Sequence, residues 1–249
     1  MIKKQKNPQN ERVETIKEEM NTVLAECATR KEKYEDFLKY SLKCTKFSVN
    51  NRAILFAHLE DPVVKTYKQW KDMGINVLST DNPVYLLRPS KYEGFYRNGT
   101  WIPIKKATKS EKQEIENGTL KVHKGVNYSW FKVFDIKDTD TSKEKVLEGE
   151  NNKNLSLVNI LSKNKMDFQS LLNDLKQKIS KKANLMEFKD TYEASVLYCC
   201  GLLLGFNPMV NDYNLFTTSD VNDIKMFAKI KKMMDAVVRD SESIVACYY

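Results

Sequence analysis

The chain has 249 residues, of which 41% are hydrophobic and 30% are charged. This composition is too apolar for an intrinsically disordered chain, and the length suffices for one large domain or two smaller ones. No apolar run approaches the roughly 18 to 20 residues needed to cross a bilayer, and the polar N-terminal stretch lacks a signal-peptide core, so we expect a cytoplasmic protein with no membrane partner.

The formal net charge of +8 is unevenly distributed along the chain. Residues 136–249 contain 16 basic and 16 acidic side chains, so the entire positive excess lies in residues 1–135. A one-sided positive charge indicates a polyanionic partner, and nucleic acid is favoured over a membrane surface.

Helical periodicity dominates the first part of the chain. Apolar residues recur at spacings of three and four over residues 11–44, which predicts a helical segment. A second helix is expected over residues 49–60, where Asp61-Pro62 ends it. A short helix over residues 65–74 is predicted to stop at Gly74.

The pattern then changes to that of a small sheet. Residues 82–89 predict a strand, and residues 93–104 predict a hairpin that turns at Asn98-Gly99. The aromatic and β-branched segment 128–136 predicts the closing strand. Between them we expect a brief helix, residues 110–118, with Ser110 as its N-cap.

Residues 141–155 are polar and nearly devoid of apolar side chains, which is typical of a linker. Beyond it, helices are expected over residues 156–182, 191–206 and 220–245. The predicted fold class is therefore α+β. Helices pack on a small antiparallel sheet in a domain of residues 1–140, and a mostly α-helical region follows at 156–249.

The composition offers little for catalysis. Five cysteines form no C-x-x-C pair and only two histidines are present, so we expect buried free thiols and no metal ion or cofactor. No nucleophile–histidine pair or phosphate-cradling glycine loop is visible, which predicts that the chain is not an enzyme. Asp135, Asp138 and Asp140 form either a divalent-ion site or, more simply, a solvated acidic loop.

Several motifs occur in a recognisable order. Ser48-x-x-Asn51 leads into an aliphatic helix, and "DPVVKTYKQWKDMG" (61–74) follows. "YLLRP" (85–89), "ATKSEKQEIENGTL" (107–120) and "VFDIKDT" (133–139) complete the series. In order and spacing they resemble the N-terminal domain of the ArdC/LtrC antirestriction family, which plasmids, conjugative elements and phages carry.

The resemblance implies a single-stranded-DNA-binding domain followed by a zinc metallopeptidase-like domain. The second half of this chain departs from that pattern, because it lacks the H-E-x-x-H helix that holds the metal. Glu193 stands at the position of the third zinc ligand, but one glutamate cannot hold zinc. Residues 156–249 are therefore interpreted as a metal-free remnant of the peptidase-like domain or as an unrelated interaction domain.

A sequence-tolerant binder of single strands needs cations for phosphates and aromatic rings for bases. Both kinds of side chain interleave in residues 65–106 and recur in the last predicted strand. The candidate nucleic-acid-binding residues are Asn51, Arg52, Tyr67, Trp70, Lys71, Tyr96, Arg97, Trp101, Lys105, Lys106 and Lys132.

Alternatives remain open at several of these positions. A helix start attracts anions, and Asn51 and Arg52 would extend that site toward a phosphate. The alternative is that Ser48 caps the helix and Asn51 forms a hydrogen bond to a neighbouring loop. Trp70 is equally typical of a core anchor. The turn after Gly74 has no lysine or arginine, although relatives in the resembled family have a basic turn there.

Two functions fit the sequence. The first is single-stranded-DNA binding for a mobile genetic element, with a role in antirestriction, DNA transfer or replication. The second is inhibition of a host defence enzyme by protein–protein contact, without DNA binding, through the C-terminal helices.

Overall fold

The computed structural model describes residues 8–142, 146, 157–207 and 215–249. These residues form an α+β structure, as predicted. The main helices are α1 (Pro8–Thr29), α2 (Lys31–Ser41), α3 (Val49–His58), α4 (Tyr67–Asp72), α5 (Lys109–Glu116), α7 (Leu157–Asn164), α8 (Phe168–Ala183), α9 (Lys189–Leu204), α10 (Thr218–Asn222) and α11 (Ile224–Val245). Three short 3₁₀ turns are η1 (Ile104–Lys106), η2 (Ile136–Asp138) and η3 (Ala246–Tyr248).

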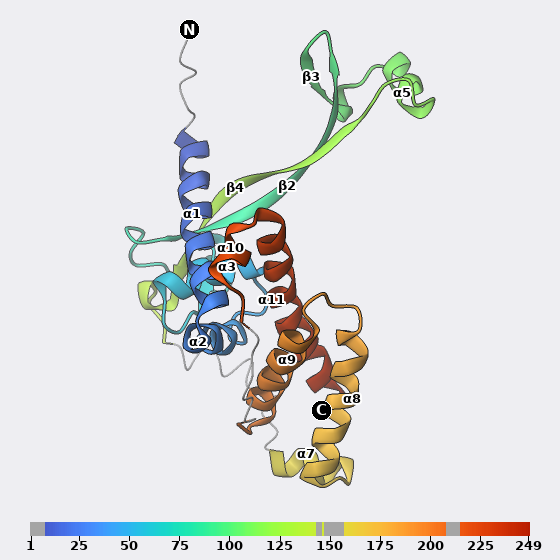
Figure 1. Cartoon of the computed structure of the whole chain (residues 1–249). Coiled ribbons are helices and arrows are strands. Elements are labelled where there is room, and N and C mark those ends of the chain that lie inside the picture. The colour runs from blue at the N-terminus through green and yellow to red at the C-terminus, as the bar shows by residue number, and fades with distance from the viewer. Residues whose placement is uncertain (1–7, 143–145, 147–156, 208–214) are drawn as a thin grey trace. The chain divides into compact units, whose positions relative to one another are not determined.

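Four strands form one antiparallel sheet in the order β1-β4-β2-β3. They are β1 (Val64–Lys65), β2 (Val84–Arg97), β3 (Thr100–Pro103) and β4 (His123–Asp135). β2 and β4 are the long strands of Figure 1.

The chain divides into two compact units. The smaller unit comprises the described part of residues 1–16 together with residues 85–131, and the larger unit comprises residues 17–84 and the described part of 132–249. This division differs from the predicted domains 1–140 and 156–249, because α2 and α3 pack with α9 and α11 in the larger unit. Most of the predicted linker, residues 143–145 and 147–155, lies outside the described residues.

In the smaller unit the predicted hairpin is confirmed. Asn98 and Gly99 have φ values of 50° and 75°, the left-handed conformation that a tight two-residue hairpin turn requires. The turn sets the register, in which Tyr96 lies opposite Trp101. β2 extends past the predicted end at residue 89, and β4 begins five residues before the predicted start at 128. Pro89, Gly94 and Gly125 therefore lie within strands, although such residues usually indicate strand ends.

The brief helix α5 begins earlier than predicted. Thr108, rather than Ser110, is the N-cap, and its backbone N–H donates to the Glu111 carboxylate at 2.6 Å. The Thr108 side chain accepts from the Glu111 N–H in return, which completes a capping box. The hydrogen bonds from Thr108 hold the pKa of Glu111 below its usual range. Gly118, at φ 72°, follows the helix end as expected.

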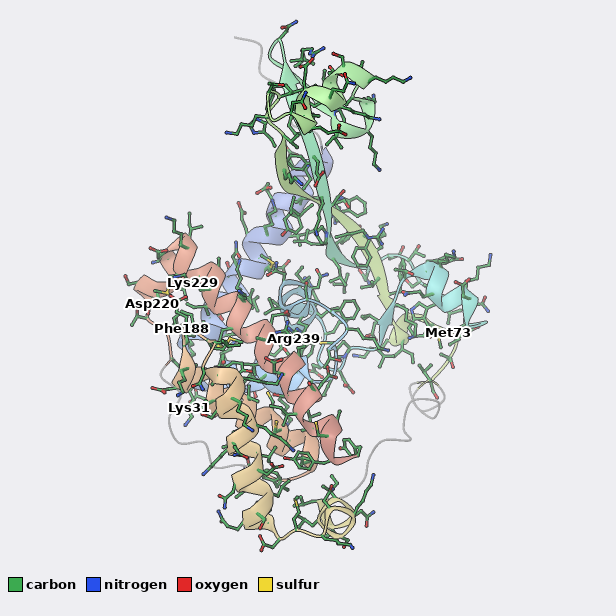
Figure 2. All side chains as sticks on the ribbon, turned by 90° about the vertical axis from the view of Figure 1, so that its right-hand side faces the viewer. Lys31, Met73, Phe188, Asp220, Lys229 and Arg239 are labelled. Atoms are coloured by element: carbon green, nitrogen blue, oxygen red, sulfur yellow. The ribbon has the colours of Figure 1, made fainter. Side chains whose placement is uncertain are left out.

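The core of the larger unit is built from α2, α3, α8, α9 and α11 together with the part of α1 after residue 16. Two pairs of buried polar groups are hydrogen-bonded in it: Tyr34 and Ser195 share a hydrogen bond of 2.7 Å, and the Tyr192 hydroxyl donates to Asp240 at 2.8 Å. Arg30, in an extended conformation, separates α1 from α2 within the segment predicted as helical. On α11, Lys229, which Figure 2 labels, pairs with Glu187 at 2.6 Å, and both side chains are half exposed.

All five cysteines are free, and four of them are buried. Burial raises the pKa of the Cys27 and Cys44 thiols to about 12, so these groups are protonated and inert at neutral pH. The prediction of buried thiols is therefore wrong only for Cys247, which is exposed. Among the helices that the structure describes, none is long and apolar enough to pass through a bilayer.

Candidate nucleic-acid interface

One face of the sheet in the smaller unit carries exposed rings. Side chains alternate between the two faces of a strand, and Arg88, Tyr92 and Tyr96 are spaced evenly along β2. Their contacts identify their neighbours: the Arg88 guanidinium lies 4.8 Å from the Phe131 ring centre, and the Tyr96 and His123 rings are 5.5 Å apart. We name this surface the aromatic face and define it by Arg88, Tyr92, Tyr96, Trp101, His123, Asn127 and Phe131.

The rings at the hairpin end of this face pack edge to face. Trp101 lies 5.2 Å from Tyr96 and 5.5 Å from Tyr92, with interplanar angles of 67° and 83°. Tyr96 is nevertheless 56% exposed and Tyr92 39% exposed. Beside the rings is a surface hollow of about 440 Å³, lined by Tyr92, Tyr96, Trp101, His123, Lys124 and Asn127.

Two glycines bring the rings close to the strands. A Cβ atom at Gly125 would lie 2.3 Å from the Tyr92 hydroxyl oxygen. A Cβ atom at Gly94 would lie 2.5 Å from Trp101 Cζ2 and 2.4 Å from the Ile102 carbonyl oxygen. Only glycine leaves room for such close approach. Gly94 and Gly125 therefore fix where the rings lie, a role that the sequence reading missed along with His123 and Asn127.

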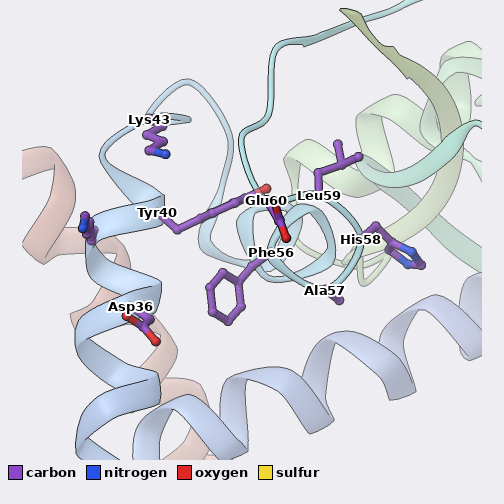
Figure 3. Close-up of a pocket in the computed structure, with 9 residues that line it drawn as sticks. Asp36, Tyr40, Lys43, Phe56, Ala57, His58, Leu59 and Glu60 are labelled. Atoms are coloured by element: carbon purple, nitrogen blue, oxygen red, sulfur yellow. The ribbon is translucent and has the colours of Figure 1, made fainter. Parts of the chain in front are cut away.

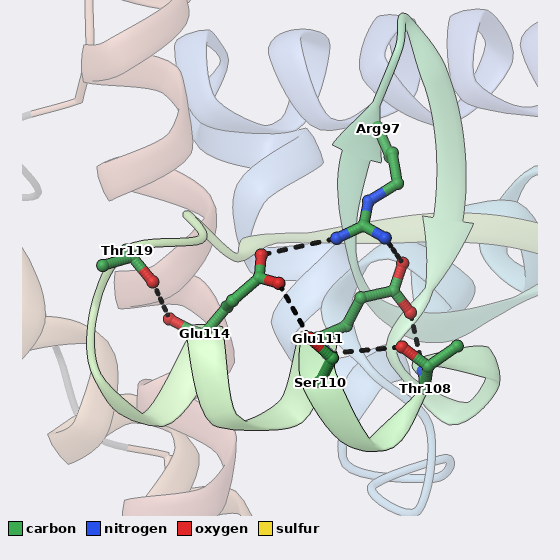
Figure 4. A network of polar contacts seen from close by, with 6 residues as sticks. All are labelled: Arg97, Thr108, Ser110, Glu111, Glu114 and Thr119. Carbon is green, nitrogen blue, oxygen red and sulfur yellow. Dashed lines mark hydrogen bonds and ion pairs between the residues drawn. The ribbon is translucent and has the colours of Figure 1, made fainter.

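The smaller unit is basic, but some of its cations have partners. Residues 85–131 contain nine lysines and arginines against four glutamates. Arg97 contacts the buried Glu111 at 3.1 Å and Glu114 at 3.3 Å, an arrangement shown in Figure 4. This guanidinium therefore holds α5, and since the Arg97 side chain is 42% exposed, its contact with a phosphate stays a prediction. Lys105 and Lys106 are exposed in η1, directly after β3, and stay available as candidates.

The structure removes Trp70 from the candidate interface. Its side chain is fully buried, packs with Phe134 and Ile136, and donates its indole N–H to the Phe134 carbonyl at 3.0 Å. No face of the ring is left for a base, so the core-anchor interpretation holds. Tyr67 is 52% exposed and rests its ring edge-on against Phe134, while Met73 ends the same short helix (Figure 2).

The start of α3 is occupied by a carboxylate of the protein itself, that of Asp235. The Asp235 carboxylate on α11 accepts hydrogen bonds from the Val49 backbone N–H at 3.0 Å and from Arg52 Nη2 at 2.5 Å. Ser48 caps the helix as predicted, accepting from the Asn51 N–H. Burial lowers the pKa of Arg52, and the nearby Asp235 opposes that shift.

The prediction that Asn51 and Arg52 contact a phosphate is therefore corrected. Arg52 is 2% exposed and Asn51 7% exposed, so neither side chain reaches a ligand on the surface. Both residues hold α3 within the core instead.

The candidates fall into both units. Tyr96, Arg97, Trp101, Lys105 and Lys106 belong to the smaller unit, and Asn51, Arg52, Tyr67, Trp70, Lys71 and Lys132 to the larger one. Within the smaller unit the structure brings Tyr96 and Trp101 together and adds Tyr92, His123 and Asn127 to them. Lys71 and Lys132 are exposed.

A second hollow, of about 390 Å³, lies in the larger unit (Figure 3). It is lined by Asp36, Lys39, Tyr40, Lys43, Phe56, Ala57, His58, Leu59 and Glu60. Lys43 is paired with Asp61 at 3.1 Å, and His58 contacts Glu19 at 2.8 Å. Because two carboxylates line this hollow and two of its basic side chains are already paired, it is less suited to a polyanion than the aromatic face.

Within the described ranges, no three His, Cys, Asp or Glu side chains gather as a metal site requires. The acidic cluster after β4 is engaged in hydrogen bonds. Asp135 accepts from the Lys137 N–H, and Asp140 accepts from the backbone and side-chain amides of Asn76. The bonds from Asn76 also hold the pKa of Asp140 below its usual range. These contacts favour the interpretation as an acidic loop, but Asp135, at 5% exposed, is buried rather than solvated.

Comparison with known proteins gives one relative and no family. No protein-family model matches the chain, and no solved structure matches it. A Bacillus anthracis protein described as uncharacterized and designated pXO2-81 is 30% identical over 144 residues. The match covers 53% of this chain and 24% of that protein, so the chain spans about a quarter of its relative's length.

Proposed function

We propose that this chain binds single-stranded DNA through the aromatic face of the smaller unit. The observation that carries the proposal is the group of Tyr92, Tyr96 and Trp101, packed together yet open to solvent beside a hollow. Such rings offer π surfaces to unpaired bases, and stacking contributes about 1–3 kcal/mol per base.

The charge of the unit supports the same ligand. Residues 85–131 have five more basic than acidic side chains, and Lys105 and Lys106 are exposed next to β3. Cations beside stacking rings are the combination that follows an unpaired strand. A duplex would offer the rings no exposed base faces, so single strands are the preferred ligand.

The biological setting that we propose is a mobile genetic element, with a role in antirestriction, DNA transfer or replication. The resemblance to the ArdC/LtrC family supports this setting. The pXO2 designation of the B. anthracis relative, which is that of a plasmid, also supports it.

Fluorescence anisotropy with a labelled oligo-dT tests the binding. We expect affinity that falls steeply with salt, because each phosphate contact releases counterions. Tyr96→Ala should weaken binding by about 5- to 150-fold, the equivalent of one lost stacking contact. Tyr128→Ala is the matched control, since Tyr128 is 38% exposed on the same strand pair but alternates to the opposite face from Asn127 and does not line the hollow.

Two results would overturn the proposal. One is the absence of binding even at low salt, and the other is equal affinity of the Tyr96→Ala and Tyr128→Ala proteins. A pull-down that instead returned a host defence enzyme in stoichiometric amount, insensitive to nuclease, would identify the chain as a protein inhibitor.

A further inference from the structure

The hollow beside the rings has a polar group in a defined place. Asn127 is exposed, lines the hollow, and lies two residues from Gly125 on β4. Residues two apart on a strand share a face, so Asn127 and the Tyr92 ring that rests against Gly125 face the same space. Asn127 is the one carboxamide among the six lining residues.

The hollow is preformed rather than assembled by a ligand. Tyr92 lies against Gly125 and Trp101 against Gly94, while Trp101 is fixed between the edges of two tyrosines. A ring held in this way loses little freedom when a base stacks on it, so less of the binding energy is lost to ordering. The volume of about 440 Å³ is ample for one flat base.

The chemistry of the lining excludes one alternative ligand. Perpendicular aromatic rings also bind quaternary ammonium groups. The charged and titratable residues that line this hollow are Lys124 and His123, and no carboxylate lines it. The Glu93 carboxylate nearest to Lys124 is already paired with that lysine at 3.1 Å. A cationic ligand would therefore find no negative side chain in the hollow. A neutral base fits the rings, and the phosphates of its strand find a positive charge in Lys124.

We propose that the hollow is a slot for one unpaired base, that adenine is the preferred base, and that Asn127 determines this specificity. The inference rests on the proposed function. A carboxamide presents one donor and one acceptor side by side, which match the N6 amino group and N7 of adenine. The inference concerns this N6/N7 edge, because on the Watson–Crick edge cytosine presents the same amino donor and ring acceptor through N4 and N3. Guanine presents only acceptors, O6 and N7, at the corresponding edge.

The test uses oligo-dT in which one central position is dT, dA, dG, dC or 2-aminopurine. For the wild-type protein we expect dA to bind about fivefold or more tightly than dT, the lower end of the discrimination that a bidentate pair gives. The base 2-aminopurine keeps the purine ring but lacks the 6-amino group. Its fluorescence should be quenched by stacking on binding, while the gain in affinity over dT should be smaller than for dA.

Asn127→Ala should reduce the dA-to-dT affinity ratio to about one. Asn127→Asp should shift the preference toward dC, because a carboxylate accepts from the cytosine amino group. Ser129→Ala is the matched control, since Ser129 is exposed, lies two residues further along β4 and does not line the hollow. This variant should keep the wild-type ratio.

The outcomes are separable. A wild-type ratio of one, with oligo-dT binding intact, overturns the base slot and leaves the proposed function in place. A dA preference that survives Asn127→Ala assigns the preference to stacking alone and overturns the role of Asn127. If no oligonucleotide binds, the proposed function fails and the base slot fails with it.

Discussion

Removal of the Asp235 carboxylate should destabilise the larger unit strongly. Asp235 accepts hydrogen bonds from Arg52 at 2.5 Å and from the first N–H group of α3 at 3.0 Å. Arg52 is 2% exposed, and its Nε atom has no hydrogen-bond partner among the described residues. Asp235→Ala therefore leaves a buried guanidinium without its counter-ion.

The magnitude follows from burial. Breaking a fully buried ion pair costs about 3–5 kcal/mol. The Asp235 side chain is 39% exposed, so water can enter the vacated space, and the lower end of that range applies. Loss of the acceptor at the start of α3 adds about 1 kcal/mol. We expect a total loss of about 3–4 kcal/mol in the free energy of unfolding.

Urea unfolding, followed by circular dichroism, measures this loss. Glu187→Ala is the matched control, because Glu187 also pairs with a cation of α11, Lys229, but both partners are half exposed. This exposed pair should contribute less than about 1 kcal/mol. The double variant Arg52→Met/Asp235→Ala should recover much of the stability, since the unpaired charge is gone. If Asp235→Ala costs no more than Glu187→Ala, our account of the α3 start is wrong.

Three further predictions follow from single contacts. Trp70→Phe should lower the free energy of unfolding by about 1–3 kcal/mol, because the Phe134 carbonyl loses its donor. The DNA affinity of the folded variant, measured by anisotropy, should be unchanged. A change in affinity would show that Trp70 belongs to the interface. Gly94→Ala should destabilise the hairpin by about 1–3 kcal/mol in urea unfolding, because the added Cβ would collide with the Ile102 backbone oxygen. Gly125→Ala should leave stability unchanged but weaken DNA binding, because its Cβ would displace the Tyr92 ring. Equal effects of the two variants on stability would contradict the geometry. The pKa of Glu111 is lowered in the folded protein, so its carboxylate stabilises α5 at neutral pH, and this contribution is lost as pH falls through the folded-state pKa. The hydrogen-exchange protection of α5 should therefore fall in acid, and Glu111→Gln should remove that pH dependence.

Local chemistry made much of the fold predictable from sequence. Asn98-Gly99 fixed the hairpin, and the apolar periodicity of the second half predicted its helices. Boundaries were predicted less well where a glycine or proline lies inside a strand, as at Pro89 and Gly125, because tertiary contacts override their local preference.

The site was only partly predictable for a different reason. Tyr96 and Trp101 were identified because both flank a tight turn, where exposure is expected. Arg52 was misassigned because its partner, Asp235, is 183 residues away in sequence. The ion pairs of Arg97 with Glu111 and Glu114 were missed because these residues belong to another element, α5. A charge pattern reports the cations of a chain but not which of them are already paired.

Photo-cross-linking tests the central claim most directly. An oligonucleotide that carries 5-iododeoxyuridine is irradiated with the full-length protein, and the linked residues are mapped by mass spectrometry. We expect cross-links at Tyr92, Tyr96 and Trp101, and their loss when unlabelled oligo-dT competes. Cross-links confined to α3 or α4 of the larger unit, or specific binding with no cross-link on the aromatic face, would contradict the account.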